Sequence, residues 1–234
     1  MGVDVISAWE DIMSGFDFSY LLGILLSVIP SLLCITLHEL SHGLAAYRLG
    51  DTTAKDMGRL TLNPIKHLDP MGLLMMLVFH VGWAKPVPVN MSRFRDPKKG
   101  MAITALAGPA SNVLITLVFL MLYGALYIPL MRSTAGTYLL QMIQLTARMS
   151  LGLAIFNLLP VPPLDGSKIL FSLLPDSAYR RLLRYERYGS LLLFALMALG
   201  VLGRPLSALI NTAYNALFPV AEGAFDLIRK LFYL

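Results

Sequence analysis

The chain has 234 residues, of which 56% are hydrophobic and only 14% are charged. Soluble domains carry about 25% charged residues, so the composition excludes an ordinary soluble protein and favours a single polytopic membrane domain over residues 1–234. The net charge of +5 does not indicate nucleic acid as a partner, because the basic residues flank apolar segments, as in membrane proteins.

The first apolar segment, residues 20–47, is long enough to cross a bilayer, since a spanning helix needs about 20 mostly apolar residues. It contains an H-E-x-x-H sequence at residues 38–42. His38 and His42 share one helix face and can bind one Zn²⁺, while Glu39 between them can contact a metal-bound water. Ionisable groups inside a membrane span are costly and usually functional, so we interpret these residues as a catalytic metal site.

The single cysteine, Cys34, excludes an internal disulfide. It lies one turn before His38 and could approach the metal, although a buried packing role is the simpler interpretation.

Residues 50–99 are rich in glycine, proline and basic side chains. The alternating patterns at 59–62 and 87–90 predict short strands, whereas residues 71–83 are apolar but too short for a normal span. We therefore expect a short membrane-embedded β or re-entrant region here, covered by protein where its backbone is irregular.

Three polar residues in this region have open roles. His67 and Asp69 either form a second metal or gating site or, more simply, stabilise a turn. His80 is expected to be a structural histidine with its hydrogen bonds satisfied.

Three later apolar segments, residues 101–131, 138–159 and 188–203, bring the expected number of transmembrane helices to about four. Counting the proline-broken segment 206–221, there are five or six apolar segments in all. The tail from Glu222 is amphipathic and is expected to lie on the membrane interface. Residues 20–170 would form the core, followed by a C-terminal span and tail over residues 175–234.

The basic residues are distributed unevenly along the chain. None precedes Arg48, nine lie between residues 48 and 99, and five lie between residues 168 and 187. The positive-inside rule places both regions in the cytoplasm and the N-terminus outside. The metal site would then open toward the cytoplasm of a multi-pass protein of the cell membrane.

Catalytic zinc has three protein ligands and one open position. We predict that the third ligand is Asp165, because the three prolines in residues 157–166 prevent a regular helix and favour an unwound segment that lines a cavity. A helix-capping role for Asp165 is the alternative, and Asp69 is the competing carboxylate.

Two asparagines are candidates for binding the substrate. Asn112 and Asn157 either donate hydrogen bonds to the developing oxyanion or to an extended substrate strand, or they form hydrogen bonds between helices.

The chain resembles the site-2 protease family of intramembrane zinc metalloproteases, in its minimal prokaryotic form without a PDZ or CBS domain. The resemblance is carried by residues 38–42, 82–89, 108–112 and 157–166 and covers most of residues 30–170. It implies that His38, His42 and Asp165 bind one Zn²⁺ and that Glu39 is the catalytic base. It also implies transmembrane or signal-peptide-like substrates.

The predicted function is therefore an intramembrane zinc endopeptidase that uses a zinc-bound water and Glu39, in regulated intramembrane proteolysis or in cleavage of signal-peptide remnants. The alternative is a membrane zinc-binding scaffold or transporter without proteolytic activity on the same fold. A transporter is expected to show internal repeats and a polar path through several helices, and we find neither in the sequence. Neither alternative requires Glu39.

Overall fold

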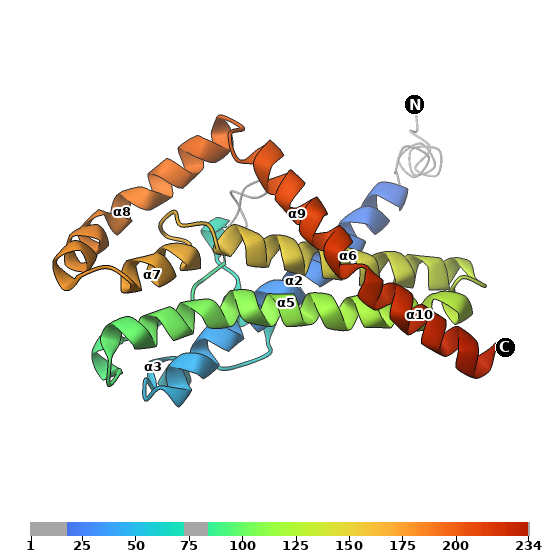
Figure 1. Cartoon of the computed structure of the whole chain (residues 1–234), viewed down its shortest axis with the longest axis horizontal. Coiled ribbons are helices and arrows are strands. Elements are labelled where there is room, and N and C mark those ends of the chain that lie inside the picture. The colour runs from blue at the N-terminus through green and yellow to red at the C-terminus, as the bar shows by residue number, and fades with distance from the viewer. Residues whose placement is uncertain (1–17, 73–83, 234) are drawn as a thin grey trace, which may run out of the picture.

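The computed structural model describes residues 18–72 and 84–233, which form a set of helices joined by loops (Figure 1). Three helices are long and apolar enough to cross a membrane: α2 (Phe18–Arg48), α5 (Pro97–Leu130) and α6 (Thr134–Asn157). The number rises to four if the bent pair formed by residues 188–198 and 203–232 is one span. This confirms the prediction of a polytopic α-helical membrane protein.

Helices α5 and α6 begin at residues that satisfy free backbone donors. The carboxylate of Asp96 accepts a hydrogen bond from Lys99 N at 3.1 Å, and Pro97 occupies the first position of α5, where no amide hydrogen is needed. Ser133 does the same for α6 by accepting from Gly136 N at 3.1 Å. Because only the short turn at residues 131–133 separates them, the two helices form an antiparallel pair, against which α2 packs.

The predicted span at residues 188–203 is not one straight helix. Helix α8 (Asp176–Ala198) ends just before Gly200, whose φ of +68° lies in the left-handed region that favours glycine. The chain then turns by 87° into α9 (Gly203–Leu217) and α10 (Pro219–Phe232).

The amphipathic tail packs against the core of the protein. Helix α10 runs along α5 (Figure 1), where a Cβ added to Gly124 would lie 1.9 Å from the carbonyl oxygen of Ala221. Glycine at position 124 is therefore what allows the two backbones to touch. Leu120, Tyr214 and Ala221 belong to one buried apolar cluster beside this contact.

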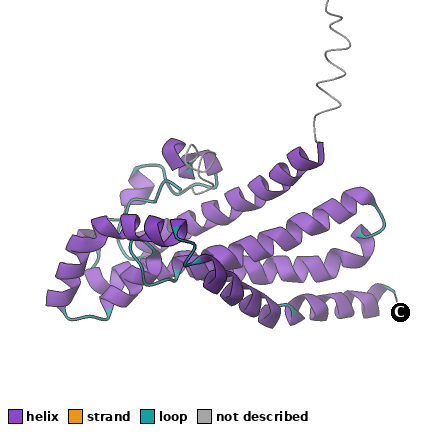
Figure 2. Ribbon diagram, turned by 90° about the horizontal axis from the view of Figure 1, so that it is seen from above, coloured by secondary structure: helices purple, strands orange, loops and turns teal. Residues whose placement is uncertain are grey.

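The strands predicted at residues 59–62 and 87–90 are absent from the part of the chain that the structure describes (Figure 2). That part contains one isolated antiparallel bridge, between Leu68 and Ala84. Pro86 and Pro88 lack amide hydrogens, so the segment around them cannot form a continuous ladder. Residues 73–83, with His80, lie outside the described residues.

The short elements of this region are α3 (Thr53–Asp56) and two 3₁₀ turns, η1 (Pro64–His67) and η2 (Met91–Arg93). Helix α7 (Asp165–Ser172) follows the irregular segment after α6.

Candidate metal centre

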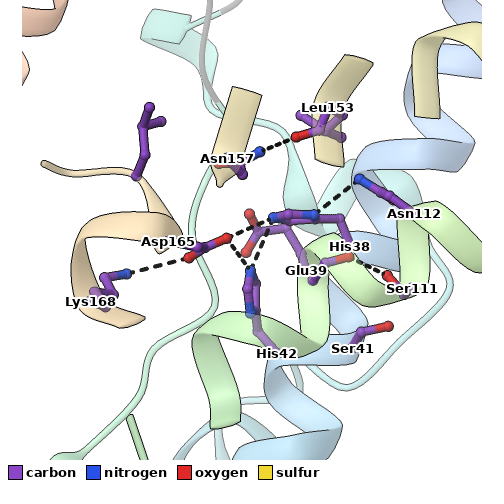
Figure 3. A network of polar contacts seen from close by, with 12 residues as sticks. His38, Glu39, Ser41, His42, Ser111, Asn112, Leu153, Asn157, Asp165 and Lys168 are labelled. Atoms are coloured by element: carbon purple, nitrogen blue, oxygen red, sulfur yellow. Dashed lines mark hydrogen bonds and ion pairs between the residues drawn. The ribbon is translucent and has the colours of Figure 1, made fainter. Parts of the chain in front are cut away.

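Three side chains from two distant parts of the chain meet at a buried point (Figure 3). His38 and His42 lie one turn apart on α2, with their Nε2 atoms 3.0 Å from each other. The Oδ2 atom of Asp165, at the start of α7, lies 3.2 Å from His38 Nε2 and 3.1 Å from His42 Nε2. All three residues are buried.

Asp165 reaches the histidines because α6 ends at Asn157 and the chain turns back before α7 begins. The prediction that the helix unwinds here is confirmed. A Cβ added to Gly166 would lie 2.1 Å from the carbonyl oxygen of Leu158, so glycine after Asp165 is required for the chain to fold back this tightly.

Gly108 on α5 lies directly against the imidazoles of His38 and His42. A Cβ at this position would lie 2.4 Å from His42 Nε2 and 2.6 Å from His38 Cε1. The absence of a side chain therefore lets α5 pass directly beneath both imidazoles.

A backbone carbonyl sets the tautomer of the neutral His42 ring. The Nδ1 atom of His42 lies 2.7 Å from the carbonyl oxygen of Thr104, which can only accept a hydrogen bond. The ring therefore carries its proton on Nδ1, and the lone pair on Nε2 points toward Asp165.

Asn112 contacts Nδ1 of His38, as the Thr104 carbonyl contacts Nδ1 of His42. Its Nδ2 atom lies 3.1 Å from His38 Nδ1, while its Oδ1 atom is buried without a hydrogen-bond partner. A half-turn of the amide exchanges its two atoms and places Oδ1 where it accepts a hydrogen bond from His38 Nδ1–H. The Nε2 lone pair of His38 is then also free to bind a metal.

The three converging atoms suit a zinc ion. With both Nδ1 atoms protonated, two nitrogen lone pairs and a carboxylate oxygen face one another, and Asp165 Oδ2 is buried without a hydrogen-bond donor. Such acceptors repel one another unless a cation lies between them. Tetrahedral ligands at zinc distances of about 2.0 Å are separated by about 3.3 Å, close to the spacing of these atoms.

Glu39 is next to this triangle but is not part of it (Figure 3). Its Oε2 atom accepts a hydrogen bond from the backbone amide of Val87 at 2.9 Å. The loop that follows Ala84 therefore helps to orient this carboxylate.

Hydrogen bonds join residues 84–93 to the neighbouring loops. Buried Asp51 accepts hydrogen bonds from Asn90 N at 2.6 Å and from Thr53 N at 3.0 Å, and Arg59 donates to the carbonyl oxygen of Lys85 at 2.7 Å. Burial alone would raise the pKa of Asp51, but the hydrogen bonds from Thr53 and Asn90 and the charge of Arg93 outweigh it and hold the pKa below its usual range.

Sequence reasoning missed three contributors to the site. Val87 and Thr104 contribute backbone atoms, for which no residue type gives a signal. Lys168 lies with its Nζ atom 3.8 Å from Asp165 Oδ1, and its position three residues after Asp165 on a helix was the available signal.

Other candidate residues have partners elsewhere. His67 Nε2 lies 2.9 Å from the carbonyl oxygen of Thr61, and Asp69 Oδ1 accepts from Gly72 N at 2.8 Å. Cys34 is buried with its Sγ atom 3.7 Å from the carbonyl oxygen of Thr146. Within residues 18–72 and 84–233, only His38, His42 and Asp165 form a cluster able to hold a metal.

The two asparagines differ in their surroundings. Asn112 is fully buried against His38. Asn157 is half-buried, and its Nδ2 atom donates to the carbonyl oxygen of Leu153 in its own helix at 3.0 Å.

Comparison with known proteins gives a consistent set of relatives. Residues 123–202 match the family model described as Peptidase family M50. The chain is 38% identical over 207 residues to "Putative zinc metalloprotease YwhC" of Bacillus subtilis (strain 168), which covers 88% of this chain and 90% of that protein. No solved structure gives a significant match.

A second relative is more distant. "Putative zinc metalloprotease Rip2" of Mycolicibacterium smegmatis is 31% identical over 188 residues, which covers 78% of this chain and 70% of that protein.

Proposed function

This chain belongs to peptidase family M50, the site-2 protease family of zinc metalloproteases, and from that membership we propose that it hydrolyses peptide bonds within transmembrane segments. The single observation that supports this most strongly is that Asp165 meets His38 and His42 beside Glu39. The two histidines and Glu39 lie on α2, a helix long and apolar enough to span a membrane. His38, His42 and Asp165 would hold one zinc ion per chain.

Zinc, when bound there, supplies Lewis acidity that makes water more acidic and polarises the scissile carbonyl group. Glu39 accepts the proton of the attacking water and later transfers it to the leaving amine. The Val87 amide holds Oε2 of Glu39 and leaves Oε1 for the proton. Lys168, beside Asp165 Oδ1, keeps Oδ2 directed at the histidines.

Asn112 has the position of a residue that orients His38, since its amide is fully buried against that ring. Asn157 is the better candidate for contact with substrate, because it is only half-buried at the end of α6. Its amide would exchange its bond to Leu153 for one to the substrate backbone or oxyanion.

The site lies below the surface of the membrane. His42 and His38 precede the end of α2 at Arg48 by six and ten residues, which is about 9–15 Å along the helix. A transmembrane substrate must unwind locally to reach it, because the amide bonds of an intact helix are sheltered and hydrogen-bonded. We propose that the site opens toward the cytoplasm, where the basic residues near it would lie.

Cleavage by the purified protein tests this proposal. The wild-type protein in vesicles is expected to cut a transmembrane peptide that contains a helix-weakening Asn-Pro pair. A chelator should stop cleavage, and added Zn²⁺ should restore it. A protein that contains zinc yet cuts neither this peptide nor signal-peptide remnants would contradict the proposal and favour a non-proteolytic zinc-binding role.

A further inference from the structure

Arg148 lies inside a membrane-spanning helix. It is 14 residues after the start of α6 and 9 before its end, which is about 21 Å and 14 Å along the axis. A guanidinium group stays protonated in proteins and is costly in the hydrocarbon layer unless something compensates it. The neighbours Ala147 and Ser150 are buried in the core, whereas the Arg148 side chain is exposed on another face of α6.

Within residues 18–72 and 84–233, polar and aromatic partners orient this charge and no carboxylate neutralises it. Arg148 Nη2 donates to Asn211 Oδ1 on α9, and its guanidinium carbon lies 5.6 Å from the centre of the Tyr214 ring. Among the described carboxylates, none forms an ion pair with Arg148. The polar and aromatic partners fix the direction of the side chain, and its positive charge remains available.

Arg148 lines a hollow of about 400 Å³ between α6 and α2. Gln141 and Gln144 precede it on the same helix face, so three side chains with N–H donors share one stripe. The opposite wall is apolar and includes Gly23, where an added Cβ would meet nothing within 4 Å. We call this hollow, lined by Gly23, Leu26, Gln141, Gln144, Leu145 and Arg148, the Arg148 groove.

We propose that the Arg148 groove binds a carboxylate of a transmembrane substrate; the proposal rests on the function proposed above. Among the described residues that line the groove, Arg148 alone is charged, and a guanidinium binds a carboxylate through paired hydrogen bonds. The carboxylate belongs either to an acidic side chain within the substrate helix or to the C-terminus of a signal-peptide remnant.

The depth of Arg148 argues against a lipid headgroup as the ligand. Headgroups lie outside a hydrocarbon layer about 30 Å thick, whereas Arg148 is more than one-third of the way along α6 from either end. A transmembrane substrate helix, in contrast, passes through this depth.

The groove would also set which peptide bond is cut. On its core face, α6 places Ser150 Oγ 2.8 Å from the carbonyl oxygen of Asn112, whose amide contacts His38. Arg148 is two residues from Ser150, so a carboxylate held in the groove lies at a fixed height relative to the metal site. Substrate register would then follow from the distance between its carboxylate and its scissile bond.

Binding of labelled peptides to the Glu39→Gln protein in phosphatidylcholine vesicles tests the inference without requiring cleavage. The first pair is a Leu/Ala transmembrane helix with Glu or Gln at successive positions across one central turn. The second pair is a shorter helix that ends at the same depth in a carboxylate or an amide. Affinity is measured at pH 8 by energy transfer from a donor fluorophore at the protein's C-terminus.

In at least one pair, the carboxylate peptide should bind about tenfold more tightly than its neutral partner, as expected for a charge-assisted hydrogen bond. The pair that shows the preference identifies the source of the carboxylate. Arg148→Gln should remove the preference and Arg148→Lys should retain part of it. The matched control, Arg132→Gln at the exposed turn after α5, should leave it intact.

A charge reversal covers the case in which Arg148→Gln does not fold. Arg148→Glu should instead prefer a peptide with Lys at the same position. Absence of any carboxylate preference in the Glu39→Gln protein with Arg148 intact, or a preference that survives Arg148→Gln, would overturn the inference. Either result leaves the protease proposal standing, because binding to Glu39→Gln does not depend on catalysis.

Discussion

A Cβ on Gly108 would lie 2.4 Å from Nε2 of His42, the atom that this histidine presents to Asp165. Gly108→Ala must therefore push α5 away from α2 or rotate the His42 imidazole away from Asp165. We expect this variant to lose zinc affinity by at least about tenfold, as when the support of a metal ligand is disturbed. Zinc content after dialysis against a weak chelator measures the effect.

The matched control is Gly223→Ala on α10, where an added Cβ meets nothing within 4 Å. It should keep its zinc and gain up to about 1 kcal/mol of helix stability. Equal zinc retention by the two alanine variants would show that α5 does not need to approach the site so closely.

The carboxylate ligand can be identified by comparing two substitutions. Asp165→Asn removes a charge that faces both histidines, so we expect zinc affinity to fall more than about 100-fold, beyond the usual effect of a supporting residue. Asp69→Asn disturbs the hydrogen bond to Gly72 and should cost about 0.5–2 kcal/mol of stability. Loss of zinc from the Asp69 variant and not from the Asp165 variant would reverse the assignment.

Much of this site was predictable because its chemistry is local or its residue types are costly where they occur. The spacing of His38 and His42 defines a helix face, and three prolines before Asp165 prevent a helix from continuing. That Asp165 lies 3.1 Å from His42 is a matter of tertiary folding across more than one hundred residues, for which the local pattern gave only a candidate.

The region around residues 50–99 was less predictable. Alternation at residues 87–90 favoured a strand, but the hydrogen bonds of this segment go to side chains, from Val87 N to Glu39 and from Asn90 N to Asp51. A pattern of apolar and polar residues predicts which side chains are buried, but it does not identify the acceptor of each backbone amide. The bend at Gly200 was missed because a single glycine in an apolar run has several possible roles.

The lowered pKa of Asp51 predicts a pH dependence of stability. A carboxyl group with a depressed pKa in the folded protein stabilises it above the unfolded value, near 3.9, and this stabilisation is lost as the pH falls through the folded value. Asp51→Asn should therefore lower the free energy of unfolding by about 1–3 kcal/mol at pH 7. The difference from wild type should shrink as the pH falls below 4.

Denaturant unfolding in detergent micelles at a series of pH values checks this. Asp56→Asn is the control, because Asp56 is exposed and bonded to Thr52 and Arg93 at the surface. A stability difference between wild type and Asp51→Asn that stays constant down to pH 2 would show that the Asp51 charge is not its source.

The orientation in the membrane can be tested by labelling. In a Cys34→Ala background, cysteine at position 4 should react with an impermeant thiol reagent in intact cells, whereas Arg95→Cys should react only after the membrane is permeabilised. The expectation follows from the basic residues between positions 48 and 99. Reaction at position 95 in intact cells, with none at position 4, would invert the topology.

The central claim is that Glu39 performs proton transfer beside a metal held by other residues, and Glu39→Gln tests it most directly. The amide keeps the size of the side chain and can still accept the hydrogen bond from Val87 N, but it cannot take a proton. We predict zinc content equal to wild type, near one ion per chain, with cleavage of the transmembrane peptide reduced at least about 100-fold. The exposed-residue control Glu222→Gln should cut normally, and substantial cleavage by zinc-loaded Glu39→Gln would contradict the account.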